Sequence, residues 1–126
     1  FKTYSERVKY LDISSNVVTV DLSDAQTFIC TATADITQFT LTNLPIQATS
    51  FSIRVEQDST GSRSVGIDTF KTTGGVDIPV YWPGNVVPQV TTTASRADIY
   101  SFKIFDGANP TTSGLYGVVG GQNFQN

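Results

Sequence analysis

Two carboxylates stand two residues apart and are the first candidates for chemistry in this sequence. Glu56 and Asp58 follow a run of strictly alternating apolar and polar residues, so a strand there would place both side chains on one face. Paired carboxylates act as acid and base in glycoside hydrolysis, which needs no histidine. In the structural alternative, Glu56 faces solvent and Asp58 caps the turn that it begins. We favour that alternative, and predict a chain that is not an enzyme.

Metal and cofactor chemistry has little support among the remaining residues. The sequence has no His, which removes the commonest metal ligand and the usual general base. Its single cysteine, Cys30, allows no disulfide within the chain and no multi-cysteine zinc site. Asp21 and Asp24 do not have the spacing of a calcium loop. We therefore predict no metal site and no cofactor, with Cys30 as a buried apolar side chain.

Aromatic side chains offer a better candidate site. Tyr81 and Trp82 precede Pro83 and place two large amphipathic rings beside a turn, where such rings stack on sugars or anchor an interface. Tyr116 adds another ring close to the end of the chain. Tyr81, Trp82 and Tyr116 are thus the predicted ligand or interface residues. The alternative for Trp82 is that it closes the open end of a hydrophobic core.

The composition indicates which elements must position these residues. The 126 residues include eighteen Thr, thirteen Val and nine Ile, against five Leu and no Met. β-branched residues favour strands, so an all-β protein is expected. The length suits one domain. A formal net charge of −3 argues against nonspecific nucleic-acid binding, and no apolar stretch is long enough for a membrane span.

Short alternating segments recur between turn signals, as in a β-sandwich or barrel. We expect hairpins across the polar turns at 14–16 and 58–62. A turn of helix is expected only at 24–26. The predicted strands are 8–13, 17–22, 27–34, 36–43, 50–57, 63–70, 78–82, 86–93, 97–105 and 115–119.

The predicted domain covers residues 1–126. Within it, 1–7 are expected to form an N-terminal extension and 120–126 a C-terminal tail. The chain begins with Phe1 and contains no Met, so we expect it to be a portion of a longer polypeptide or a matured product.

Several motifs occur in a fixed order over about residues 8–124. They are TLTNLP at 40–45, FSIRVEQDSTGSRSV at 51–65, YWPG at 81–84, TTTASRADIYSF at 91–102, DG at 106–107, LYG at 115–117 and GGQNF at 120–124. This string resembles a small β-domain of structural proteins in tailed bacteriophages, especially cyanophages, where it commonly ends tail fibres or other appendages. The chain departs from the pattern at 66–70, where an aromatic-proline pair is often found, and in the longer segment 108–113.

The resemblance implies an antiparallel, jelly-roll-like β-sandwich that assembles as a homotrimer or lines a symmetric lattice. It implies a virion location, contacts with other virion proteins and no catalysis. It does not separate a fibre from a neck or capsid position. A second hypothesis is a carbohydrate-binding module that recognises host surface glycans through Tyr81 and Trp82. A third, much weaker, is a depolymerase that uses Glu56 and Asp58.

Overall fold

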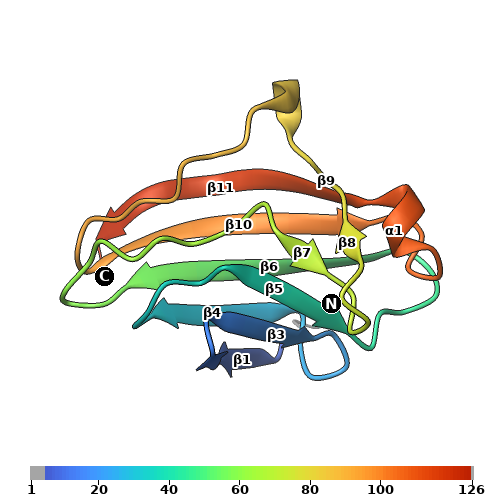
Figure 1. Ribbon diagram of the computed structural model, residues 1–126, viewed down its shortest axis with the longest axis horizontal. Helices are drawn as coiled ribbons and strands as arrows, with labels where there is room; N and C mark the ends of the chain where they lie inside the picture. The colour runs from blue at the N-terminus through green and yellow to red at the C-terminus, as the bar shows by residue number, and fades with distance from the viewer. Residues whose placement is uncertain (1–4, 126) are drawn as a thin grey trace.

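The protein consists of two β-sheets that enclose one hydrophobic core (Figure 1). The computed structural model describes residues 5–125. The larger sheet has six strands in the order β1-β4-β6-β10-β11-β9, and the smaller sheet has five in the order β2-β3-β5-β7-β8. The expected all-β class is therefore confirmed.

The larger sheet is built from β1 (Val8–Leu11), β4 (Thr27–Ala32), β6 (Thr49–Gln57), β9 (Val80–Tyr81), β10 (Arg96–Ile104) and β11 (Leu115–Gln125). The smaller sheet is built from β2 (Ile13–Ser14), β3 (Val17–Asp21), β5 (Gln38–Thr42), β7 (Phe70–Lys71) and β8 (Asp77–Ile78). Two short helices, η1 (Pro83–Asn85) and α1 (Pro110–Ser113), complete the elements within residues 5–125. The segment that carries η1 projects from the body of the molecule (Figure 1).

Both sheets are mixed, which corrects the expected antiparallel jelly roll. From β3 to β6 the chain crosses from one sheet to the other at every connection, so strands next to each other in a sheet are not consecutive in sequence. After each pair of crossings the chain returns to the first sheet and runs in the same direction as the strand beside it. The pairs β1–β4, β4–β6, β3–β5 and β5–β7 are accordingly parallel. Antiparallel pairing is found where β10 joins β6 and β11.

The hairpin expected across residues 58–62 is wrong, because the chain leaves the larger sheet after Gln57 instead of turning back beside β6. It crosses to the smaller sheet, where Val65 forms an isolated parallel bridge with Ile36. A Cβ on Gly66 would lie 2.8 Å from the carbonyl oxygen of Thr37, so only a glycine permits this close approach. The segment 86–93, also predicted as a strand, forms no strand either.

Other local expectations have mixed outcomes. The hairpin at 14–16 is confirmed: β2 and β3 are antiparallel, and Ser15 and Asn16 both have positive φ, as a two-residue turn requires. The predicted C-terminal tail is wrong, since β11 pairs with β10 as far as Gln125. Of the predicted extension 1–7, residues 1–4, including Phe1, lie outside the described residues. The helical turn forms at α1 and not at 24–26.

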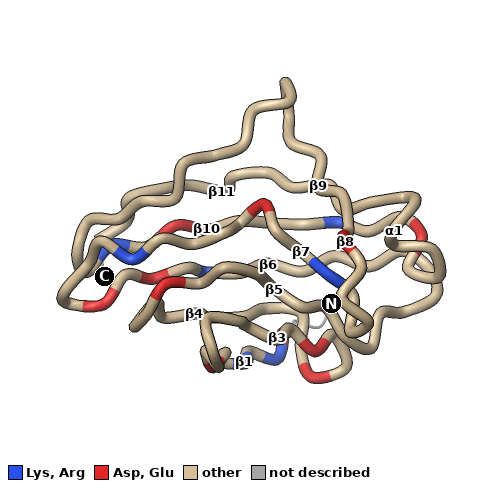
Figure 2. Tube along the Cα trace, in the orientation of Figure 1, with Lys and Arg blue, Asp and Glu red and all other residues tan. Residues whose placement is uncertain are grey.

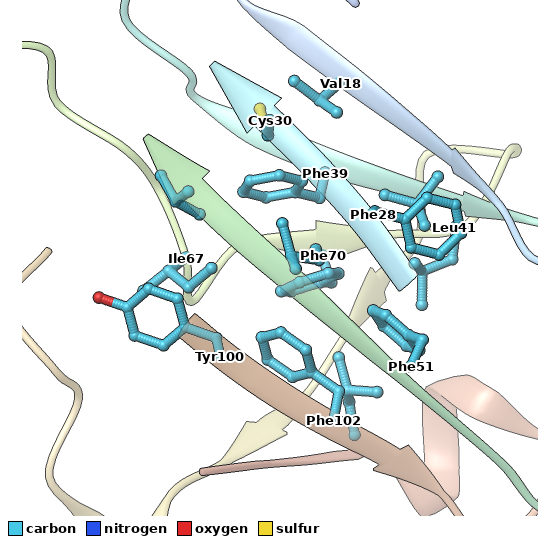
Figure 3. Packing of buried hydrophobic residues seen from close by; sticks show 14 of the residues in the cluster. Val18, Phe28, Cys30, Phe39, Leu41, Phe51, Ile67, Phe70, Tyr100 and Phe102 are labelled. Atoms are coloured by element: carbon cyan, nitrogen blue, oxygen red, sulfur yellow. The ribbon is translucent and has the colours of Figure 1, made fainter. Parts of the chain in front are cut away.

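The core lies between the sheets and is rich in aromatic rings (Figure 3). The ring of Phe70, from the smaller sheet, lies 5.0 Å from Phe102 and 6.4 Å from Phe51, both from the larger sheet. Cys30 is fully buried, as predicted, and burial raises the pKa of its thiol to about 12. Tyr100 and Phe102 point inward from β10, which is a central strand between β6 and β11. This alternation leaves the opposite side chains of β10 on the outer face of the larger sheet.

Acidic and basic residues are interspersed along the chain (Figure 2). No helix among the described residues is long and apolar enough to cross a membrane.

Candidate functional site

The structure separates the three aromatic residues that the sequence singled out. Trp82 is only 7% exposed and packs in the core, with its ring edge-on to Phe102 at 5.7 Å. Its indole Nε1 donates a hydrogen bond of 2.7 Å to Oδ1 of Asp68, which satisfies the polar end of the ring. Trp82 thus has the structural place that the alternative predicted, and it is not available to a ligand.

Tyr81 and Tyr116 come together on the surface. Parallel pairing of β9 with β11 sets the two residues opposite each other, with ring centroids 5.2 Å apart. Phe105, which the sequence analysis did not select, lies 5.4 Å from Tyr116 in an edge-on arrangement. Their exposures are 45% for Tyr81, 46% for Tyr116 and 61% for Phe105. We call these three residues the aromatic patch.

A shallow groove of about 480 Å³ adjoins the aromatic patch on the outer face of the larger sheet. Its volume is within the range of roughly 300–1,000 Å³ found for ligand pockets. Strand register explains its lining, because residues that share a row across the strands share a face. The row nearest the patch is Ser50, Lys103, Tyr116 and Tyr81, and the next row is Ser52, Ser101 and Val118. We call this feature the aromatic groove.

The polar groups of the aromatic groove are hydroxyls and one ammonium. The hydroxyls of Ser52 and Ser101 are in mutual hydrogen-bond contact at 3.0 Å. Lys103 is the one charged residue among those that line the groove. Its Nζ lies 5.3 Å from the centre of the Phe105 ring, within cation–π range. Within residues 5–125, Lys103 forms no salt bridge.

A second hollow of about 500 Å³ lies on the same sheet and is lined by Arg54, Glu56, Ala97, Ile99, Phe124 and Gln125. Its two charges neutralise each other, since Arg54 Nη2 lies 2.7 Å from Glu56 Oε2. Glu56 also accepts a hydrogen bond of 3.1 Å from the Thr31 hydroxyl. Both of its carboxylate oxygens therefore have partners within the protein.

Asp58, the other carboxylate of the candidate pair, caps the turn after β6. Its Oδ1 accepts hydrogen bonds from the backbone amides of Thr60 and Gly61, and its Oδ2 lies 3.0 Å from Nη2 of Arg63. The Arg63 hydrogen bond, followed by that from Gly61, holds the pKa of Asp58 below its usual value. These contacts agree with the structural alternative for Asp58.

The most deeply buried carboxylate, Asp98, was not identified from the sequence. Its oxygens accept hydrogen bonds from the amides of Thr91 (2.8 Å) and Asn123 (2.9 Å) and from the Tyr100 hydroxyl (2.7 Å). The Gln122 side chain donates a fourth, at 3.2 Å. Burial acts to raise the pKa of Asp98, but the hydrogen bonds outweigh it and the pKa is lowered. This network joins β10, β11 and the segment before β10.

Metal-ligating side chains are not clustered in the part of the chain that the structure describes, where no group of three or more His, Cys, Asp or Glu could hold an ion. Of the pair considered for calcium, Asp21 instead closes a turn. Its Oδ1 accepts hydrogen bonds from the Ser23 hydroxyl and from Nδ2 of Asn43, and these bonds lower its pKa.

Comparison with protein-family models, with curated proteins and with solved structures finds no match to this chain. The function must therefore be argued from the geometry above and from the motifs of the sequence.

Proposed function

We propose that this chain is a non-enzymatic structural β-domain of a tailed-phage virion, which assembles with copies of itself, as a homotrimer, and with other virion proteins. The motif string motivates the virion context. The observation that supports assembly is a sheet with two open, apolar edges.

The first edge is β1, which pairs with β4 on one side and with no described strand on the other. Val8 and Tyr10 on this strand are 48% and 67% exposed. The second edge is β11, which β9 covers only at Leu115 and Tyr116. Beyond them, the exposed apolar side chains on β11 are Val118, Val119 and Phe124.

Unpaired strand edges readily pair with another chain, and natural monomers usually protect them with charges, proline or a covering segment. β11 carries no charged residue, and the one charged residue of β1, Lys9, lies 3.9 Å from the carboxylate of Asp24. The exposed apolar side chains of the two strands therefore favour pairing over protection. If the β1 edge of one copy met the β11 edge of the next, the contact would be head-to-tail, and such contacts generate rings when the rotation closes. The resemblance implies a homotrimer, and three copies joined in this way would form such a ring.

Sedimentation velocity over a range of concentrations tests this assembly. We expect a species near three times the chain mass of 13.6 kDa. Tyr10→Lys should weaken association about tenfold, as expected when an exposed aromatic anchor is replaced by a charge at an edge. Val76→Lys is the matched control, because Val76 is 55% exposed in the turn between β7 and β8, away from both edges.

A monomer at every concentration would contradict the assembly proposal, as would equal effects of the two lysine variants. The virion context has its own test, which is a cryo-electron microscopy map of intact particles that contain the chain. Density for this domain at a fibre, neck or capsid position is the expected result.

A second candidate function is recognition of a host surface glycan, and the aromatic groove favours it. Exposed rings beside hydroxyl groups suit sugars, whose faces are apolar and whose edges carry hydroxyls. Tyr81 and Tyr116 were among the predicted residues, Phe105 was not, and Trp82 is excluded by burial. Tyr116→Ala should reduce binding on a glycan array about tenfold, whereas Val76→Ala, in the turn between β7 and β8 of the smaller sheet, should not.

A further inference from the structure

We propose that the aromatic groove takes a sugar that carries a carboxylate, such as a uronic acid within an oligosaccharide. This inference rests on the second candidate function and specifies its ligand. Three observations lead to it: the platform of rings, the serine hydroxyls and the ammonium of Lys103, which forms no salt bridge with any residue from 5 to 125.

The rings and hydroxyls define where the sugar would lie. The row from Ser50 on β6 to Tyr81 on β9 crosses three strand spacings, or about 14 Å, which is longer than one sugar ring. Tyr116 and Phe105 offer ring surface at one end of the groove, and Ser52 and Ser101 offer donors and acceptors at its floor. The shape therefore suits an oligosaccharide that lies across the strands.

The charge of the groove selects the kind of sugar. Among the described residues, Lys103 brings a positive charge to a lining that contains no carboxylate. In the neighbouring hollow the cation of Arg54 is already paired with Glu56, so that hollow attracts an anion less strongly than the aromatic groove does. A carboxylate placed near Lys103 Nζ would form a charge-assisted hydrogen bond, which is stronger than one between neutral groups.

An acidic residue at the other end of the groove would orient the ligand. Glu6 lies beside Ser50 and Ser52 in an adjoining hollow and accepts a hydrogen bond of 2.6 Å from the Thr27 hydroxyl. Its negative charge repels a carboxylate from the β4 side of the sheet. The sugar carboxylate is thereby directed toward Lys103 and the aromatic patch.

Isothermal titration with two tetrasaccharides tests the proposal. One alternates glucuronic acid with N-acetylglucosamine, and the other contains N-acetylglucosamine alone and is neutral. We expect the wild-type chain to bind the acidic sugar more tightly, by about fivefold, the size of one partly exposed ion pair. The preference should shrink as salt rises, because screening weakens the charge contact.

Three variants make the result specific. Lys103→Gln should abolish the preference for the acidic sugar, so that the acidic and the neutral sugar bind with equal affinity. Lys71→Gln, on the smaller sheet and paired with Asp77, is the matched control and should leave the preference intact. Phe105→Ala should weaken binding of both sugars about tenfold. Unchanged melting temperatures confirm that the variants are folded.

The outcomes separate the inference from the function on which it rests. Equal affinity for the two sugars, with both weakened in Phe105→Ala, would overturn the acidic ligand and leave glycan recognition in place. Binding of neither sugar by the wild-type chain would overturn both. If Tyr116→Lys instead converts an oligomer to monomers, a second copy covers this face and the sugar proposal is wrong.

Discussion

Among single residues, Asp98 combines deep burial with an ionised side chain. A buried carboxylate is tolerated only if hydrogen bonds replace the water that it loses. Asp98 receives them from two backbone amides, at Thr91 and Asn123, and from the hydroxyl of Tyr100. Asn123 lies near the end of β11 and Thr91 in the segment before β10, so the carboxylate ties both of them to β10.

Asp98→Asn should therefore destabilise the protein although the side chain keeps its shape. Every direct partner is a donor, so the new amide group would face donors and leave some of them unsatisfied. We expect a loss of about 2–3 kcal/mol, or roughly 10 °C in melting temperature for a chain of this length. Calorimetry measures it. Asp77→Asn, at a side chain that is 83% exposed, should change the melting temperature little, and a similar drop in both variants would contradict this account.

Some residues of the candidate site could be predicted from the sequence, but their contacts could not. Tyr81 and Tyr116 could be selected because each is a large ring beside a turn or glycine, but their contact depends on β9–β11 pairing, which no local pattern reports. Phe105 was missed although the sequence held a signal. Side chains alternate between the two faces of a strand, and Phe105 falls in the same series as Ser101 and Lys103. Because Phe102 and Ile104 point inward, Phe105 is expected on the outer face.

At the level of elements, long strands with strict alternation were predicted well, and connections were not. The ranges 50–57 and 97–105 nearly match β6 and β10, because burial of one face and exposure of the other imposes a period of two. The segment 63–70 has similar residues but only Phe70 enters a strand. A turn signal shows that the chain changes direction; it does not show whether the chain returns to the same sheet or crosses to the other.

The contact between β11 and the segment after β9 depends on a residue without a side chain. A Cβ built on Gly117 would lie 2.6 Å from Cζ3 of Trp82, which is closer than atoms pack. Gly117→Ala must displace the indole ring, and we expect a destabilisation of about 1–3 kcal/mol. Trp82 is the single tryptophan of the chain, so its fluorescence spectrum should shift at the same time.

Gly74→Ala is the matched control for that variant. The nearest atom to a Cβ there is 3.8 Å away, which is ordinary contact, and the substitution should leave the fluorescence unchanged and stability equal or slightly higher. A Gly117→Ala protein with wild-type fluorescence and melting temperature would show that Trp82 is not held in the core as described.

For the whole molecule, the decisive feature is a chain path that alternates between two sheets. Parallel neighbours such as β4 and β6 are joined only through a strand of the opposite sheet. The sequence predicted the all-β class from its β-branched residues, which act locally. It could not predict mixed sheets, because pairing partners are set by packing across the core and by crossings that leave no periodic signal.

Polar contacts hold several of these crossings and turns, and they make the whole fold sensitive to acid. Hydrogen bonds to the ionised form lower the pKa of Asp21, Asp58 and Asp98, which lie in different parts of the molecule. A carboxyl whose pKa is lower in the folded state than in the unfolded state stabilises the fold above the unfolded value, about 3.9 for Asp. That contribution is lost as pH falls toward the lower folded value.

Urea unfolding midpoints should therefore be nearly constant from pH 8 to pH 5, because the chain has no His to titrate in that range, and should fall steeply below about pH 4. The Asp98→Asn protein should start from a lower midpoint and show a shallower acid dependence, since one of the three carboxylates no longer titrates. A midpoint that declines steadily from pH 7, or an equal acid slope in wild type and variant, would mean that these hydrogen-bonded carboxylates do not control the stability of the fold.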